Sequence, residues 1–295
     1  MSPDEPRFTG YRLKVAGFMD IAGDRDAETT AGLSSEQDWR TFFSRFSRVI
    51  LVANSEQVDV PALRRAYTDD ALFVFFNKAY KVLQQPFAGH SMLVSRAQPR
   101  GANIVYRGEV EQVLGLFVPD SFHGILNIRL AESETPNTQT DYGGTPTGHL
   151  DLTSLGNGIY PADKLPTSGF ALAYWLLEQR VPVEVVLAGF SGKRSEKWRV
   201  VAVHDWVFEQ VCLRVFATAG KLSLHNADLS DPYAKLSARF PEIPPSQISF
   251  TVADVLSQRI GNTDAQVDKL ISLTGVLKSA DMFLRNLKPR FLKKR

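Results

Sequence analysis

The stretch LPTSGFALAYWLLEQRVPVEVVLAGFSGKRSEKWRVVAVHDWVFE, from Leu165 to Glu209, decides the fold that this sequence predicts. Pro166 and Thr167 precede a strong apolar run, which is typical of a capped helix start. The β-branched run VEVVLAG that follows predicts a strand ending in glycine. A helix followed directly by a strand indicates an α/β layer, in which ligands bind at the carboxyl ends of the strands.

The start of this helix also predicts an anion site. Thr167 and Ser168 supply short hydroxyls, and Gly169 has no side chain that would keep a phosphate from the backbone. The free N–H groups of a first helical turn attract negative charge. We therefore expect Thr167, Ser168 and Gly169 to bind the phosphate of a ligand.

The same stretch resembles the small and very-small sialylmotifs of the sialyltransferases that use CMP-activated sialic acid. The matching pattern is Pro-Thr-Ser-Gly-Phe, then Leu-Ala-Gly-Phe, and then His204 with Glu209 five residues later. The order of these segments, their spacing and the apolar residues around them all agree with the sialylmotifs. The resemblance covers residues 48 to 226, with matches at separate islands.

Two polar strand ends upstream fit the same family. The run RVILV leads into Ala53, Asn54 and Ser55, which is similar to the family's Gly-Asn-Ser turn. The run LFVFF ends at Asn77, which resembles the family's second nucleotide-contacting asparagine. The resemblance implies that Asn54, Ser55 and Asn77 contact the ribose and cytosine. Ala53 departs from the family's glycine, so the backbone is expected to approach the nucleotide less closely.

The resemblance implies a fold and a reaction. The fold is α/β, a Rossmann-like nucleotide-binding glycosyltransferase domain of the GT-A-variant type, working without a metal or cofactor. The reaction moves an ulosonic acid, sialic acid or Kdo, from its CMP-activated donor to a glycan hydroxyl with inversion. His204 is then the general base and Glu209 supports the site. The alternative for His204 alone is a helix-capping or hydrogen-bonded core histidine.

The loop before His204 carries Lys193, Arg194 and Lys197. These cations either stabilise the leaving phosphate or are simply solvated. Four further histidines lack the spacing of a zinc cluster. Ser168 lacks the Gly-x-Ser-x-Gly context of a hydrolase nucleophile, so a serine hydrolase is not predicted.

The amino-acid composition limits the classes of protein to which this chain can belong. The 295 residues are 44% hydrophobic and 22% charged, which suits a globular protein with one large core. A net charge of +2 is too small to indicate a nucleic-acid partner. The single cysteine, Cys212, excludes the disulfide of the family's animal members and indicates a bacterial relative. A polar start and no apolar run of membrane-spanning length predict a cytoplasmic protein.

We expect three parts: a polar preface over residues 1–45, a catalytic domain over 46–230 and a helical extension over 231–295. In the preface, Asp24-Arg25-Asp26 matches the DxD motif of metal-dependent transferases. That motif should follow a nucleotide-fold strand, and this one precedes it, so a solvated loop is expected. A helix capped by Asp38 is predicted from Asp38 to Phe46.

Further elements follow along the chain. A helix is predicted over residues 59–67, and strands over 72–76, 91–96, 103–107, 122–130 and 221–224. Arg96, Arg100 and Arg107 could reach an anionic donor or acceptor, although surface charge is the default expectation for each. Residues 131–163, rich in Thr, Gly, Asn, Asp and Pro, predict little regular structure. The family resemblance implies that this region is a lid that becomes ordered over the donor. Tyr142 and Tyr160 are phosphate contacts from that lid or ordinary loop aromatics.

The chain beyond residue 228 reads as an appendage, with a helix predicted over residues 246–261. Apolar residues recur near helical spacing from Val267 to Leu287, and the chain ends NLKPRFLKKR. This basic tail either lies on the anionic inner membrane or packs on the core. Membrane placement fits a glycolipid acceptor in capsule or lipopolysaccharide synthesis.

Two other kinds of function stay open. One is a transferase that uses another nucleotide sugar, which a requirement for divalent metal would indicate. The other is a non-catalytic nucleotide- or glycan-binding protein on the same fold. A reaction rate that does not change when His204 is replaced by alanine would indicate the non-catalytic class.

Overall fold

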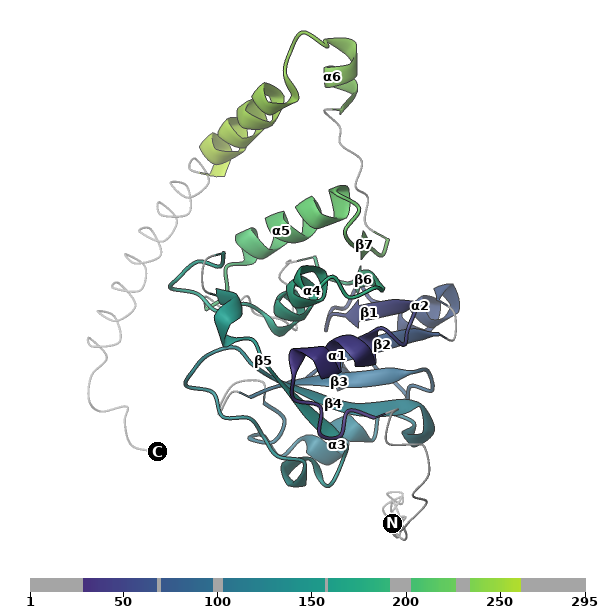
Figure 1. Cartoon of the computed structure of the whole chain (residues 1–295). Coiled ribbons are helices and arrows are strands. Elements are labelled where there is room, and N and C mark those ends of the chain that lie inside the picture. Colours follow the sequence, from purple (N-terminus) through teal and green to yellow (C-terminus); the bar gives the residue numbers. More distant parts are fainter. Residues whose placement is uncertain are drawn as a thin grey trace, which may run out of the picture. The chain divides into compact units, whose positions relative to one another are not determined.

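The computed structural model describes residues 29–67, 70–97, 103–156, 159–191, 203–226 and 234–260. The chain divides into two compact units, Met1–Ala227 and Asp228–Arg295. The first unit contains a seven-stranded sheet flanked by helices (Figure 1), so the predicted α/β class is confirmed. The second unit contains α6 (Ala234–Arg239) and a helix over residues 245–260.

The sheet is parallel throughout its described strands, in the order β5-β4-β3-β2-β1-β6-β7. The strands are β1 (Arg48–Val52), β2 (Ala71–Phe76), β3 (Ser91–Arg96), β4 (Phe122–Arg129), β5 (Thr147–Asp151), β6 (Glu184–Ala188) and β7 (Ser223–Leu224). The chain moves outward from β1 to β5 and then returns to add β6 on the other side of β1. Ligands of such sheets bind at the carboxyl ends of the two strands where this reversal occurs, here β1 and β6.

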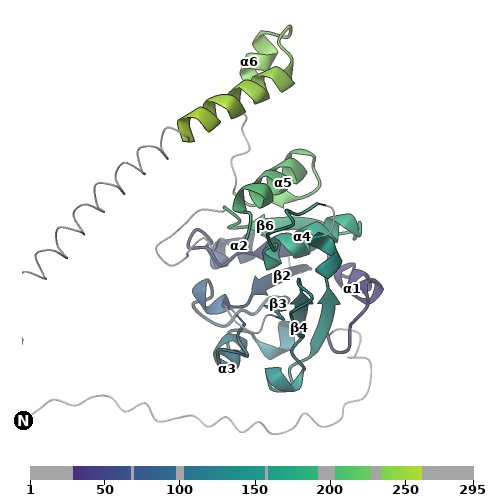
Figure 2. The ribbon, with the colours of Figure 1, turned by 90° about the vertical axis from the view of Figure 1, so that its left-hand side faces the viewer.

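Helices cover both faces of the sheet (Figure 2). The helices α1 (Glu36–Phe43), α4 (Ser168–Glu178) and α5 (Trp206–Thr218) contribute to one apolar cluster, whereas α2 (Val60–Ala66) and α3 (Val110–Leu114) contribute to the other. Val49 and Leu51 of β1 face the first cluster, and Ile50 and Val52 face the second. Strands buried on both faces explain the continuous apolar runs in the sequence.

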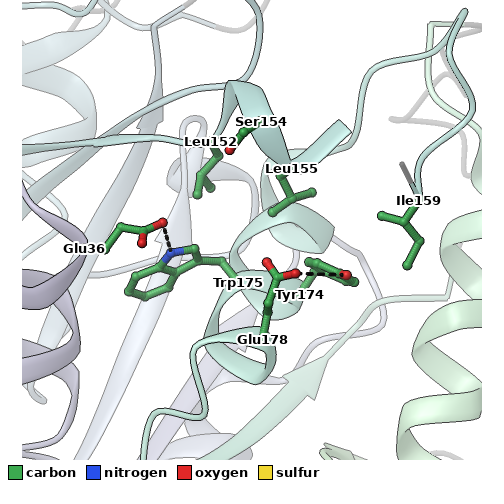
Figure 3. Close-up of a pocket in the computed structure, with 8 residues that line it drawn as sticks. All are labelled: Glu36, Leu152, Ser154, Leu155, Ile159, Tyr174, Trp175 and Glu178. Carbon is green, nitrogen blue, oxygen red and sulfur yellow. Dashed lines mark hydrogen bonds between the residues drawn. The ribbon is translucent and has the colours of Figure 1, made fainter. Parts of the chain in front are cut away.

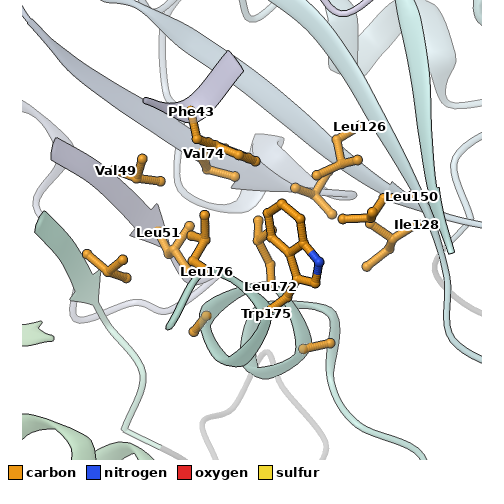
Figure 4. Packing of buried hydrophobic residues seen from close by; sticks show 14 of the residues in the cluster. Phe43, Val49, Leu51, Val74, Leu126, Ile128, Leu150, Leu172, Trp175 and Leu176 are labelled. Carbon is orange, nitrogen blue, oxygen red and sulfur yellow. The ribbon is translucent and has the colours of Figure 1, made fainter. Parts of the chain in front are cut away.

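Helix α4 lies between the sheet and α5. Its residues Leu172, Trp175 and Leu176 pack on apolar side chains of the strands (Figure 4), and seven of its residues are buried. On its other side, Phe170 contacts Phe208 of α5 at a ring separation of 6.1 Å. The helix is therefore apolar nearly all round, as a helix covered on two sides must be.

Most predicted elements are confirmed. The strands β2, β3 and β4 lie within one residue of their predicted bounds. Asp59 caps α2 by accepting the Ala62 N–H at 2.9 Å. Thr167 caps α4 in the same way by accepting the Phe170 N–H at 3.2 Å. Local patterns suffice for these elements because each has its own cap or β-branched run.

The predicted cap of α1 is wrong. The helix begins at Glu36, and Ser35 caps it by accepting the Asp38 N–H at 3.1 Å. Asp38 returns a bond by accepting the Ser35 N–H at 3.0 Å, which completes a capping box. Trp39, Phe42 and Phe43 of this helix are buried in the core, so the last part of the predicted preface belongs to the sheet domain.

The strand predicted over residues 103–107 is also wrong. Asn103 begins a turn there, because its Oδ1 accepts the N–H groups of Val105 and Tyr106 at 2.8 and 3.2 Å. An asparagine side chain that bonds its own backbone two residues on competes with a strand ladder. The β-branched residues of this segment therefore lie in a turn and do not pair with a strand of the sheet.

Residues 131–163 were predicted to hold little regular structure, and this is wrong for β5, which pairs with β4 at one edge of the sheet. A buried network fixes the neighbouring loop. Asn127 donates to the Tyr142 hydroxyl at 2.9 Å and accepts the Asn137 N–H at 2.9 Å. Tyr142 also donates to Ser95 Oγ at 2.8 Å. The polar residues of this loop are thus largely paired with one another.

Several predictions concern residues outside those that the structure describes. They are the DxD match at Asp24 and Asp26, Arg100, the cations of residues 193–197 and the basic tail. Within the described ranges, no helix combines the length and apolar character that crossing a membrane requires.

Candidate functional site

The eight predicted site residues all lie at or near the carboxyl edge of the sheet. Asn54 and Ser55 follow β1, and Asn77 follows β2. The helices α4 and α5 each lead from that edge back to the next strand, so their N-termini lie there too. Thr167, Ser168 and Gly169 start α4, whereas His204 and Glu209 stand just before and just inside α5.

Glu209 joins α5 to the start of α4. Its Oε1 accepts the Thr167 N–H at 2.7 Å and the Tyr160 hydroxyl at 2.8 Å, while its Oε2 accepts the Thr167 hydroxyl at 2.7 Å. The residue is only 3% exposed. Burial raises the pKa of this carboxyl, although the bonds from Thr167 and Tyr160 act in the opposite direction. Glu209 therefore positions the N-terminus of α4, and the same carboxylate holds the Tyr160 hydroxyl.

His204 is anchored through one ring nitrogen. Its Nδ1 lies 2.7 Å from the Leu165 carbonyl oxygen, so Nδ1 carries the proton that it donates there. The Leu165 N–H in turn donates to the Val203 carbonyl at 2.9 Å, which joins the two segments a second time. The other nitrogen, Nε2, then holds a lone pair.

The surroundings of His204 favour its neutral form. Burial lowers the pKa of the imidazole, the bond to Leu165 acts to raise it, and the positive charge of Arg96 lowers it further. A histidine that is neutral near pH 7 can accept a proton at its free nitrogen. The geometry is therefore suited to a general base.

Arg96 lies beside His204 and the segment that leads into α4. It was expected at the surface, but it is 7% exposed, so that expectation is wrong. Its Nε donates to Glu134 Oε1 at 2.8 Å, and its Nη1 lies 3.5 Å from the Pro166 carbonyl oxygen. The available signal was its place in SMLVSR, where a cation ends a fully buried strand at the ligand-binding edge.

The two predicted asparagines connect neighbouring strand ends. Asn54 donates from Nδ2 to the Phe76 carbonyl at 2.8 Å, and Asn77 accepts the Arg96 N–H on its Oδ1 at 3.2 Å. Asn77 has a φ of 35°, a left-handed conformation that asparagine tolerates. Contacts thus run from β1 through β2 to β3 and on to the segment before α4.

Two glycines let the ends of β1, β6 and α4 approach closely. Gly189 has a φ of +79°, and a Cβ there would collide with Val58 and press on Ser55. A Cβ on Gly169 would collide with the ring of Phe190. Gly169 therefore allows the loop after β6 to pack on α4. The absence of a side chain at Gly169 thus has a packing role, and phosphate binding at this position stays a prediction.

A pocket of about 400 Å³ lies beside α1 and α4 (Figure 3). None of the eight predicted site residues lines it. Its two carboxylates already have protein partners, since Glu36 accepts from the Trp175 indole at 3.3 Å and Glu178 accepts from the Tyr174 hydroxyl at 3.3 Å. Across the described ranges, no group of three or more histidine, cysteine or acidic side chains is placed to hold a metal ion.

No protein-family model matches this chain, and no curated protein matches it in sequence. The chemistry of the site therefore follows from its own arrangement. A neutral imidazole, a buried guanidinium and a capped helix N-terminus meet at the carboxyl edge of a parallel sheet. Such a site can accept a proton and hold an anionic ligand.

Proposed function

We propose that this protein is an inverting glycosyltransferase, of the GT-A-variant Rossmann-like type, that moves an ulosonic acid from CMP to a glycan hydroxyl. The observation that carries the proposal is His204. Its Nδ1 is anchored on the Leu165 carbonyl, so Nε2 is left to act as a base at the edge where nucleotides bind in α/β sheets. Burial, which lowers the pKa of His204, supports that role.

In the proposed reaction, the acceptor hydroxyl attacks the anomeric carbon of the ulosonic acid. Its proton passes to His204 Nε2, and the bond from the anomeric carbon to the phosphate oxygen breaks, with the electron pair leaving on CMP. A single displacement of this kind inverts the configuration. The partial positive charge at the N-terminus of α4, where Ser168 and Gly169 stand, stabilises the departing phosphate.

The other residues hold and position the substrates. Asn54, Ser55 and Asn77 at the ends of β1 and β2 are proposed to bind the nucleoside. Glu209 holds Thr167 through both oxygens and so maintains the start of α4. We further propose that the acceptor is a glycan or glycolipid of capsule or lipopolysaccharide synthesis, made at the cytoplasmic face of the inner membrane.

Thermal unfolding with CMP, UDP and GDP, each with magnesium and with EDTA, tests the donor class. A ligand at about a hundred times its dissociation constant adds about 2.7 kcal/mol to the free energy of unfolding. We expect CMP alone to stabilise the protein, equally in magnesium and EDTA. Stabilisation only by UDP or GDP with magnesium would contradict the proposal and favour another nucleotide sugar.

Release of CMP from CMP-sialic acid and from CMP-Kdo, with a glycan acceptor, tests catalysis itself. The matched control is His204→Ala, which should still be stabilised by CMP because the imidazole is assigned to the acceptor proton. Binding of CMP without acceptor-dependent turnover by the wild-type protein would indicate a non-catalytic binding protein.

A further inference from the structure

Arg96 is buried, charged and incompletely hydrogen-bonded. A guanidinium has five N–H donors, and buried donors are normally paired. Its Nη2 is buried and has no hydrogen-bond partner among the residues that the structure describes. A charged donor in this state is costly to the folded protein and is available to an anionic partner.

The guanidinium is held in place by its other contacts. Nε donates to Glu134 Oε1 at 2.8 Å, and the second oxygen of Glu134 accepts the Leu130 N–H at 2.8 Å. Nη1 points to the Pro166 carbonyl at 3.5 Å, next to the start of α4. Glu134 therefore holds Nε and leaves Nη2 to another acceptor, and Arg96 is fixed beside the candidate base, whose pKa its charge lowers.

A second unpaired atom lies along the same edge. Asn54 Oδ1 is buried without a hydrogen-bond partner in the described part of the chain. Asn54 follows β1 and Arg96 ends β3, with β2 between them, so their backbones are about 10 Å apart at the usual strand spacing. A ligand lying across this edge would bring a hydroxyl or amino donor to Asn54 and an anion to Arg96.

We propose, resting on the function proposed above, that Arg96 Nη2 binds an anionic oxygen of the CMP-activated donor beside its reacting carbon. The carboxylate of the ulosonic acid and the phosphate of CMP share this chemistry. Because Nη2 is buried, the donor reaches it by displacing a neighbouring group. Arg96 thereby contributes to selecting an acidic donor.

The test measures the dissociation constants of CMP, CMP-sialic acid and CMP-Kdo by calorimetry. The main variant is Arg96→Gln with Glu134→Gln, because the double change leaves no unpaired carboxylate in the core. We expect it to bind the CMP-sugars about tenfold to a hundredfold more weakly than wild type, which is the usual loss for a hydrogen bond to a charged group. Arg107→Gln makes the same change at an exposed arginine and should bind like wild type.

The pattern of losses identifies the anion. Weaker binding of the CMP-sugars with unchanged binding of CMP assigns Arg96 to the carboxylate, and equal losses for all three ligands assign it to the phosphate. Unchanged affinities in a folded double variant would overturn the inference while leaving the proposed function intact. Failure of the wild type to bind any cytidine ligand would instead overturn the proposed function, and this inference with it.

Arg96→Lys provides a second variant in case the double variant does not fold. Lysine keeps the positive charge but has no second fork nitrogen to replace Nη2. We expect it to bind the CMP-sugars with a loss smaller than that of the double variant. A folded Arg96→Lys protein with wild-type affinity for all three ligands would also overturn the inference.

Discussion

The carboxyl edge of the sheet is built differently at its two ends. Over β3 to β5, the buried side chains of Asn127, Tyr142 and Ser95 pair with one another, and the backbone of half-buried Asn137 bonds to Asn127 and His149. Over β1 to β3, Asn54 Oδ1 and Arg96 Nη2 are buried and have no partner within the described residues. We call the first the paired end and the second the unpaired end.

The comparison shows that a polar residue after a buried strand has two uses. At the paired end its hydrogen bonds are completed inside the protein, and burial raises the pKa of Tyr142 to about 12. At the unpaired end, Asn54 Oδ1 and Arg96 Nη2 can still form hydrogen bonds with a ligand. Stability should therefore depend on the paired end and function on the unpaired end.

The largest expected effect is on catalysis at His204, whose pKa is lowered by the charge of Arg96 at the unpaired end. His204→Ala removes the proposed base and should lower the rate of CMP release by about 10²- to 10⁴-fold. Stability should fall by only about 1 kcal/mol, because one hydrogen bond to Leu165 is lost. Steady-state kinetics and urea unfolding on the same preparation separate the two effects. An unchanged rate would remove His204 from the mechanism.

The next effect is on stability at the paired end. Asn127→Ala leaves the Asn137 N–H without its acceptor and removes bonds to Tyr142 and Ser95. Because buried groups lose their partners, we expect a decrease of about 3 kcal/mol in the free energy of unfolding, measured in urea. The affinity for CMP should stay at the wild-type value. A large loss of CMP affinity in the folded variant would show that the two ends are not separate.

A smaller effect is expected at Asn54, the counterpart of Asn127. Asn54→Ala removes a bond to the Phe76 carbonyl but also removes a buried unpaired oxygen, so stability should change little. Affinity for CMP should fall about tenfold, the usual loss for one well-placed hydrogen bond to a ligand. Calorimetry with CMP checks this. The comparison breaks down if the variant is destabilised as much as Asn127→Ala yet keeps its affinity.

The smallest effect is in the pH dependence. Burial lowers the pKa of His204 below its ordinary value of 6.5, so the rate should fall with acidity only below pH 6.5. The folded protein then binds this proton less readily than the unfolded chain. The contribution of His204 to the free energy of unfolding is complete above pH 6.5, and it decreases as the pH falls toward the lowered pKa. Unfolding of wild type and His204→Ala at two pH values should show a difference that shrinks in acid.

The sequence was sufficient for features whose causes are local. The strand over Ser91–Arg96 and the helix after Thr167 are determined by a buried apolar run and a cap, so both were predicted. The predicted site residues also gather at one edge, because turns after parallel strands and the starts of the following helices share it. The turn at Asn103 was missed because a side-chain bond to its own backbone outweighed strand propensity.

By itself, the sequence determined the α/β class, most strand and helix positions, and the polar residues that the carboxyl edge would carry. Only the tertiary structure decided which of those residues are paired. Glu209 meets Thr167 across 42 positions and Arg96 meets Glu134 across 38. Such contacts depend on the order of strands in the sheet and on which helix covers which face. Hydrophobic periodicity and local caps carry no information about either, so the distinction between a structural network and a ligand site appears only in the folded chain.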